Sequence, residues 1–182
     1  MFVEIKNAFS NDLCDEISAA CNPLINKDSL DYEFNRQGNS VRLSDHKSLI
    51  YIQNRLRTRF NELVEKKLKF EYSLDLSRLK DSEFTFHKYG EEDNLNIHSD
   101  GISNEVPGHP RVLSTVIHLT DNPDADLIFP RHNKHIKTEK GKFVAFLPHS
   151  CYEHYCNNNS GSPREVVVTW LLDNHLTLNS II

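Results

Sequence analysis

Apolar residues in the first third of the chain recur at the three- and four-residue spacing of amphipathic helices. One such stripe follows Ser10, a suitable N-cap, and predicts a helix that ends before Pro23. A longer stripe predicts a second helix over residues 46–69, with Ser44 or Asp45 as its N-cap. We therefore expect two helices, each of which packs one face on the core.

After residue 70 the pattern changes to the alternation of apolar and polar residues that is typical of strands. The expected strands cover residues 71–76, 83–89, 94–98, 111–120, 127–129, 135–137, 142–147, 152–156 and 164–172. Many short strands separated by turn residues favour an antiparallel sandwich or barrel. The predicted fold class is α+β, mainly β, in one domain over residues 1–182, with helical support and a lid loop in 1–80 and the β core in 81–182.

A polar, irregular segment covers residues 26–45, between the two expected helices. Segments of this length without regular structure are often binding loops or lids. Arg36 and Arg42 in this segment could contact an anionic substrate, and both are candidate substrate-binding residues. The alternative is that they are ordinary arginines on the surface.

Composition limits the classes of function that remain. The chain has 182 residues, 38% of them hydrophobic and 26% charged, with a net charge of -5. No apolar run is long enough for a transmembrane helix, and the start of the chain lacks the pattern of a secretory signal. A basic surface for nucleic acid is not expected at this net charge. We expect a soluble, cytoplasmic protein that binds neither nucleic acid nor a membrane.

The four cysteines are expected to be reduced thiols, since no secretory signal accompanies them. Cys14 and Cys21 lie seven residues apart on a helical pattern, so we expect both in the core. Cys151 and Cys156 flank His154, a combination that could bind zinc. Structural zinc sites usually combine closer cysteine pairs with a second pair elsewhere, so this pattern disfavours zinc.

Three other positions form a candidate metal site. His98 and Asp100 are two positions apart in an extended segment, a separation that places both side chains on the same side. His154 lies in another expected strand and could supply a third ligand. Two imidazoles and one carboxylate suit non-haem Fe(II) in oxygenases, because they leave other coordination positions open. His-x-Asp occurs often by chance, so the prediction depends on the three residues together.

The last expected strand begins with a charged residue, Arg164, on a face that is otherwise apolar and includes Trp170. A buried charge is costly when it has no partner. A planar guanidinium can hold a carboxylate by two hydrogen bonds, so a bound dicarboxylate would supply that partner. The alternative is a salt bridge at the rim with Glu165 or Asp126.

Several motifs follow one another between residues 84 and 172. They are Phe86-His87-Lys88-Tyr89-Gly90, His98-Ser99-Asp100, the segments 111–115 and 118–121, Leu127-Ile128-Phe129-Pro130, the segment 139–146, His154, Arg164 and Trp170. In order and spacing they resemble the Fe(II)- and 2-oxoglutarate-dependent dioxygenases, and within them the prolyl 4-hydroxylase-like branch. One departure is Asp124-Ala125-Asp126, which stands where relatives usually have two glycines and changes the entry to that strand.

The resemblance implies a double-stranded β-helix core (a jelly-roll, or cupin-like, fold) buttressed by the N-terminal helices. It implies that His98, Asp100 and His154 bind Fe(II). It also implies that 2-oxoglutarate chelates the iron, with Arg164 paired to the distal carboxylate, and that O2 takes the remaining position. Decarboxylation of 2-oxoglutarate to succinate would then be coupled to hydroxylation of an unactivated C–H bond. Ascorbate is a further cofactor that the resemblance admits.

Two neighbouring residues follow from the same resemblance. Tyr89 matches a tyrosine that lines the cosubstrate pocket in this branch. On strand parity, His118 falls where some relatives place a tyrosine that helps to bind the distal carboxylate. A histidine can donate the same hydrogen bond in the right tautomer, whereas the alternative is an ordinary buried histidine.

The resemblance favours a prolyl residue of a peptide or protein as the substrate. A free amino acid or another small metabolite stays open as an alternative, because loops rather than the fold select the substrate. A third hypothesis is a non-catalytic jelly-roll that binds a metal or ligand, which the metal ligands together with Arg164 disfavour. We expect no catalytic residue beyond the metal centre.

Overall fold

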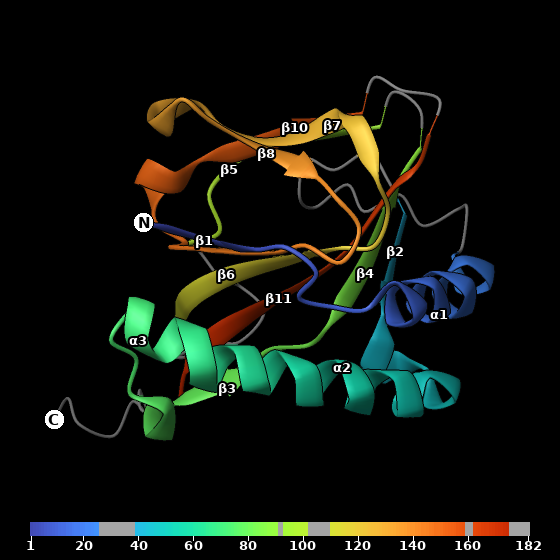
Figure 1. Cartoon of the computed structure of the whole chain (residues 1–182), viewed down its shortest axis with the longest axis horizontal. Helices are drawn as coiled ribbons and strands as arrows, with labels where there is room; N and C mark the ends of the chain where they lie inside the picture. The colour runs from blue at the N-terminus through green and yellow to red at the C-terminus, as the bar shows by residue number, and fades with distance from the viewer. Residues whose placement is uncertain (26–38, 91–92, 102–109, 159–161, 175–182) are drawn as a thin grey trace, which may run out of the picture.

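Two antiparallel sheets lie over one another, and N-terminal helices cover the outer face of the larger sheet (Figure 1). The structure is a computed structural model that describes residues 1–25, 39–90, 93–101, 110–158 and 162–174. It confirms an α+β fold made mainly of strands. Among the helices of these segments, none is long and apolar enough to cross a membrane.

The larger sheet has seven strands in the described residues, with the long strand β11 in its interior. Its order is β1 (Phe2–Ile5), β9 (Phe143–Phe146), β6 (Arg111–His118), β11 (Arg164–Asp173), β4 (Thr85–Tyr89) and β2 (Asn39–Arg42), and β3 (Leu79–Asp81) also pairs with β11. Because side chains alternate along a strand, one face of this sheet meets the helices and the other faces the smaller sheet.

Within the described segments the smaller sheet has four strands, and it carries two of the three candidate metal ligands, His98 and His154. Its order is β5 (Asn94–His98), β10 (His154–Asn157), β7 (Asn122–Phe129) and β8 (Lys134–Thr138). Side chains of both sheets form a shared apolar cluster, in which Val116 and Val166 of the larger sheet meet Leu127 and Cys156 of the smaller one. This inner layer forms the walls around the site.

A second core lies between the larger sheet and the helices α1 (Asn11–Cys21) and α2 (Ile50–Leu63), whereas the short helix α3 (Lys69–Glu71) buries no residue. Phe60 of α2 is fully buried, and its ring meets those of Phe84 and Phe143 edge-on, at centroid distances of 5.6 and 6.2 Å. Burial of such a side chain contributes about 1.5–3 kcal/mol. The helices thus pack on the outer face of the larger sheet, and its inner face is available to form the site.

The helix predictions are confirmed in position and corrected at their ends. The Ser10 hydroxyl caps α1 by accepting a hydrogen bond of 3.3 Å from the N–H of Leu13. The predicted helix over 46–69 consists of a 3₁₀ turn, α2, a π-helical turn (Val64–Leu68) and α3. Ser44 and Asp45 do not cap it, because both lie in a separate 3₁₀ turn before the helix.

Three expectations about extended segments are wrong. The predicted strand over 71–76 is absent from the described chain, since helical structure continues to Glu71 and the alternating apolar side chains pack from irregular backbone. The segment 26–45 is not wholly irregular, because its residues 39–42 form β2, whereas 26–38 and with them most of the expected lid loop lie outside the described residues. β7 begins at Asn122 rather than at residue 127, and a register shift there accommodates Pro123 within the strand.

Candidate metal centre

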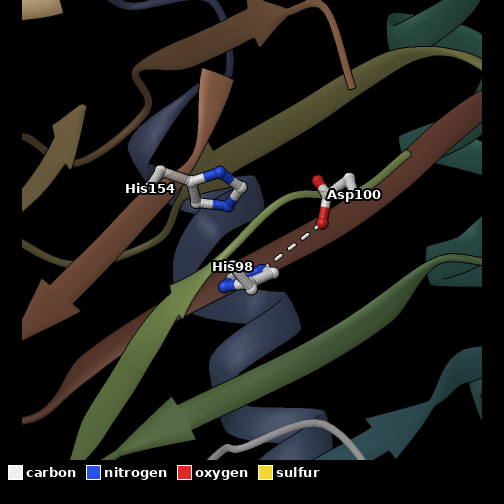
Figure 2. A group of neighbouring side chains, drawn as sticks. All are labelled: His98, Asp100 and His154. Atoms are coloured by element: carbon white, nitrogen blue, oxygen red, sulfur yellow. Dashed lines mark ion pairs between the residues drawn. The ribbon is translucent and has the colours of Figure 1, made fainter. Parts of the chain in front are cut away.

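His98, Asp100 and His154 converge between the two sheets (Figure 2). His98 ends β5 and His154 begins β10, and the two residues are direct partners in the antiparallel register. Their ring centroids are 4.3 Å apart. One ligand atom of each of the three residues lies within 4.8 Å of those of the other two. The pairing of β5 with β10 therefore brings His154 next to His98, although the two residues lie far apart in the sequence.

Asp100 reaches the site from a bend, which corrects the expectation that it continues the strand of His98. β5 ends at His98, and the chain turns over the next residues. The turn brings Gly101 against the backbone of Pro148, where a Cβ would lie 2.8 Å from the carbonyl oxygen. Only glycine permits this close approach, so Gly101 helps to place Asp100 beside the two histidines.

Both histidines are oriented by backbone carbonyl groups. Nδ1 of His98 lies 2.8 Å from the carbonyl oxygen of Asn96, and Nδ1 of His154 lies 3.1 Å from that of Tyr152. If each Nδ1 carries the proton and donates it to the carbonyl, each Nε2 is unprotonated and can bind a metal. Nε2 of His98 is also the atom that faces Asp100, at 3.4 Å from Oδ1.

The surroundings of Asp100 favour its ionised form. Burial by itself would raise the pKa of this carboxyl group. The hydrogen bond from His98 and the positive charges that His154 and His98 carry when protonated lower the pKa well below its ordinary value. Asp100 is therefore a carboxylate at neutral pH and can act as a negatively charged ligand.

The triad is compatible with Fe(II), because it combines two imidazoles and one carboxylate on one side of a cavity. Within the described segments it is the only group of three or more histidine, cysteine or acidic side chains close enough for a metal. Cys156 is buried in the inner core, whereas Cys151 is exposed, and neither forms a disulfide within the described residues. Neither cysteine belongs to the group of candidate metal ligands that contains His154.

Arg164 is almost completely buried at the start of β11 and lines the same cavity as the triad. Its Nε and Nη1 atoms have no hydrogen-bond partner among the described residues. The predicted alternative of a rim salt bridge is wrong, because Glu165 pairs with Lys88 at 3.1 Å and Asp126 pairs with Lys137 at 2.9 Å. The guanidinium lies 5.2 Å from the ring centroid of Tyr89, the predicted pocket-lining residue, which is its partner in the strand register.

His118 lies near Arg164 on the inner face of the larger sheet. It pairs in register with Val166, one of the residues that line the cavity. The ring is fully buried, and neither nitrogen has a hydrogen-bond partner in the part of the chain that the structure describes. Burial, together with the positive charges of Arg164 and Lys142, lowers the pKa of His118 well below its ordinary value. His118 is therefore neutral at pH 7, with one donor and one acceptor nitrogen.

Of the two candidate substrate-binding arginines, only Arg42 lies within the described residues. Arg42 is exposed at the end of β2, the edge strand of the larger sheet. It pairs with Thr85, which pairs in turn with the cavity-lining Val168, so Arg42 lies on the cavity side of the sheet, two strands away. Arg36 lies outside the described residues.

The sequence indicated the strand face of Trp170 but no contact for its side chain. The indole Nε1 of Trp170 donates a hydrogen bond of 3.1 Å to Oδ2 of Asp100. Strand parity placed Trp170 on the correct face of the last strand. The contact itself depends on the bend after His98, for which the sequence carries only the weak signal of Gly101.

The buried, neutral state of His118 predicts a pH dependence of stability. The unfolded chain binds a proton at this residue below a pH of about 6.5, whereas the folded chain does not. The free energy of unfolding should therefore fall as the pH is lowered from 7 to 5, with a contribution from His118 of up to roughly 1 kcal/mol per pH unit. Chemical denaturation at several pH values should show a shallower dependence for His118→Gln. The exposed His149→Gln serves as the control, and equal slopes for the His118 variant and the unaltered protein would contradict the prediction.

Comparison with solved structures identifies the fold. The chain is similar to a viral collagen prolyl hydroxylase from Paramecium bursaria Chlorella virus-1, solved as its 2OG complex, with a TM-score of 0.74 and 14% identity over 94% of this chain and 96% of that chain. It is also similar to a Pseudomonas putida prolyl-4-hydroxylase, with a TM-score of 0.64 and 14% identity over 93% of this chain and 91% of the other.

A third similar structure is a prolyl hydroxylase from Trichoplax adhaerens, in complex with a peptide fragment of the oxygen degradation domain of hypoxia inducible factor. The TM-score is 0.70, with 13% identity over 100% of this chain and 87% of the other. No family model and no curated protein matches the sequence. The three similar structures together confirm the jelly-roll fold that was expected from the sequence.

Proposed function

We propose that this chain is an Fe(II)- and 2-oxoglutarate-dependent dioxygenase that hydroxylates an unactivated C–H bond, with a prolyl residue of a peptide or protein as its substrate. The observation that carries the proposal is one cavity that combines a His-Asp-His triad with a buried arginine whose Nε and Nη1 atoms are unpaired. A metal site alone would fit many proteins, whereas this pairing fits a metal and a dicarboxylate together.

The residues present fit the proposed cosubstrate. An unpaired buried guanidinium is costly, and a bound carboxylate would both neutralise it and accept its hydrogen bonds. His118 adds a neutral ring near Arg164 with no partner for its donor nitrogen. The distal carboxylate of 2-oxoglutarate matches both needs, and its 2-oxo acid end would extend towards the triad.

Each part of the chain then has a separate task. When bound, Fe(II) and 2-oxoglutarate would supply the electrons that activate O2 for reaction with a C–H bond. The triad would hold the iron from one side, and Arg164 with His118 would orient the cosubstrate. Apolar side chains that line the cavity, among them Val116 and Leu127, would limit the access of water.

A peptide substrate is the finer part of the proposal. It is supported by the similar fold of prolyl hydroxylases, one of which is solved with a peptide fragment bound. Arg42 is an exposed cation at the edge of the sheet on the cavity side, and we assign it a contact with an acidic group of the substrate. The fold does not select between a peptide and a small metabolite, so experiment must.

A spectroscopic titration and a substrate screen test the function. Anaerobic addition of Fe(II) and 2-oxoglutarate is expected to produce a visible charge-transfer band, and its absence from metal-loaded protein would contradict the proposal. In air, succinate formation should be stimulated by proline-containing peptides and not by free amino acids. Stimulation by free amino acids alone would show that the substrate is a small metabolite. A charge-transfer band without stimulation by either would show that the proposed substrate class is wrong. His154→Ala protein serves as the inactive control for succinate release.

A further inference from the structure

The two carboxylate oxygens of Asp100 have different partners. Oδ1 lies 3.4 Å from Nε2 of His98, one of the two candidate histidine ligands. Oδ2 accepts a hydrogen bond of 3.1 Å from Nε1 of Trp170. Both side chains are more than nine-tenths buried, so little water competes for this bond. The carboxylate is therefore held in one rotation, with Oδ2 on Trp170 and Oδ1 beside His98.

Arg111 fixes the indole and the backbone of Asp100 at the same time. A register shift between Leu171 and Leu172 places Arg111 opposite Leu172, on the inner face of the sheet. Its guanidinium carbon lies 3.7 Å from the centroid of the Trp170 ring, in a cation–π stack. Its Nη1 donates a hydrogen bond of 3.2 Å to the main-chain carbonyl of Asp100. The planar guanidinium of Arg111 therefore contacts both the donor residue and the acceptor residue of the Trp170–Asp100 hydrogen bond.

We infer that Trp170, supported by Arg111, is a positioning residue that makes Asp100 a ligand through Oδ1 alone. The inference rests on the proposed function, because it concerns the ligand geometry of the metal centre. A carboxylate that is free to rotate can bind a metal through both oxygens and occupy an additional position. Held by the indole N–H, Asp100 occupies one position and leaves room for a chelating 2-oxo acid and O2. Outer partners of this kind also raise metal affinity, because they orient the ligand before the metal arrives.

The sequence allows the N–H group to be removed almost without a change of shape. Trp170 is the only tryptophan of the chain. Biosynthetic replacement of tryptophan by β-(3-benzothienyl)alanine therefore exchanges a single N–H for sulfur and alters no other residue. Replacement by 5-fluorotryptophan, made in the same way, retains the N–H and is the matched control.

Titration of the metal-free protein with Mn(II), followed by the electron paramagnetic resonance of free Mn(II), measures the affinity. The benzothienyl protein is expected to bind Mn(II) roughly 10- to 100-fold more weakly than the fluorotryptophan protein. The Co(II)-loaded forms add a readout that a purely structural role would not alter. Their visible absorption should differ in intensity, because a second bound oxygen changes the coordination number of the ion.

The possible outcomes separate the inference from the proposed function. Equal Mn(II) affinities and equal Co(II) spectra for the two proteins would overturn the positioning role of Trp170. If neither protein nor the unaltered chain binds Mn(II), the proposed metal centre itself is wrong. Arg111→Met should weaken Mn(II) binding by a smaller factor, about threefold to fivefold, since only the stack and one hydrogen bond to the backbone are lost. Arg57→Met, which removes an arginine stacked over Phe84 at 5.5 Å, is its control, and an equal effect of the two would remove Arg111 from the inference.

Discussion

Replacement of Arg164 by methionine is expected to stabilise the ligand-free protein and at the same time to abolish the binding of 2-oxoglutarate. The guanidinium is almost fully buried, with Nε and Nη1 unpaired in the described part of the chain. Unsatisfied buried polar groups cost about 1–3 kcal/mol each, whereas the lost cation–π contact with Tyr89 contributes about 0.5–2 kcal/mol. A net gain of roughly 1 kcal/mol is therefore expected in chemical denaturation without ligands.

Affinity for 2-oxoglutarate, in contrast to stability, is expected to fall in the Arg164 variants. With Mn(II) present, 2-oxoglutarate should raise the thermal midpoint of the unaltered protein and leave that of Arg164→Met unchanged. Arg164→Lys keeps the charge without the planar fork, so an intermediate affinity for 2-oxoglutarate is expected. Mn(II) affinity in the absence of 2-oxoglutarate should be equal in all three proteins. A loss of stability together with unaltered binding of 2-oxoglutarate would show that Arg164 is a structural residue instead.

The sequence predicted this residue well because strand parity is a short-range rule. A period of two placed Arg164 and Trp170 on one face of the last strand, and the structure has both on the inner face of β11. The cost of a buried charge then indicated that Arg164 needs a partner, either a bound dicarboxylate or a rim salt bridge with Glu165 or Asp126. Its Nε and Nη1 atoms have no hydrogen-bond partner among the described residues, so the structure does not bear out the salt bridge.

Long-range geometry was less accessible to sequence reasoning. That His98 and His154 are direct cross-strand partners follows from the register of β5 and β10, which no local pattern specifies. The bend that carries Asp100 depends on a close approach between Gly101 and Pro148. A strand over 71–76 was predicted wrongly because apolar residues that alternate in sequence can also pack against helices from irregular backbone.

β11 connects the two ends of the proposed site. Its inner face carries the cosubstrate anchor Arg164 at one end and Trp170, which contacts the metal ligand Asp100, at the other. Val166 and Val168 lie between them and line the same cavity. Because β11 lies inside the sheet, hydrogen-bonded to β4 and β6, the spacing between the anchor and the metal centre is set by one of the best-supported strands of the fold.

Replacement of His154 by alanine is expected to eliminate metal binding and with it the charge-transfer band of the Fe(II) and 2-oxoglutarate complex. The variant removes one of the three proposed ligands in the described part of the chain, so the loss of Mn(II) affinity should exceed the roughly 10- to 100-fold that is typical of outer partners. The ring also packs against Phe146 and Phe129, at centroid distances of 4.9 and 5.3 Å. Some loss of stability will therefore accompany the loss of the metal, and Mn(II) titration together with denaturation measures both.

A matched histidine separates these two effects. His132 is exposed and packs against Tyr152 in a tilted arrangement, at a centroid distance of 4.6 Å, but it does not belong to the triad. His132→Ala should reduce stability without a change in Mn(II) affinity. His154→Asn keeps more of the buried volume and should still lose most of the Mn(II) affinity, since an amide is a poor replacement for imidazole as a ligand of this metal class. Unaltered Mn(II) binding by a folded His154→Ala protein would place the metal elsewhere and remove the basis of the proposed dioxygenase.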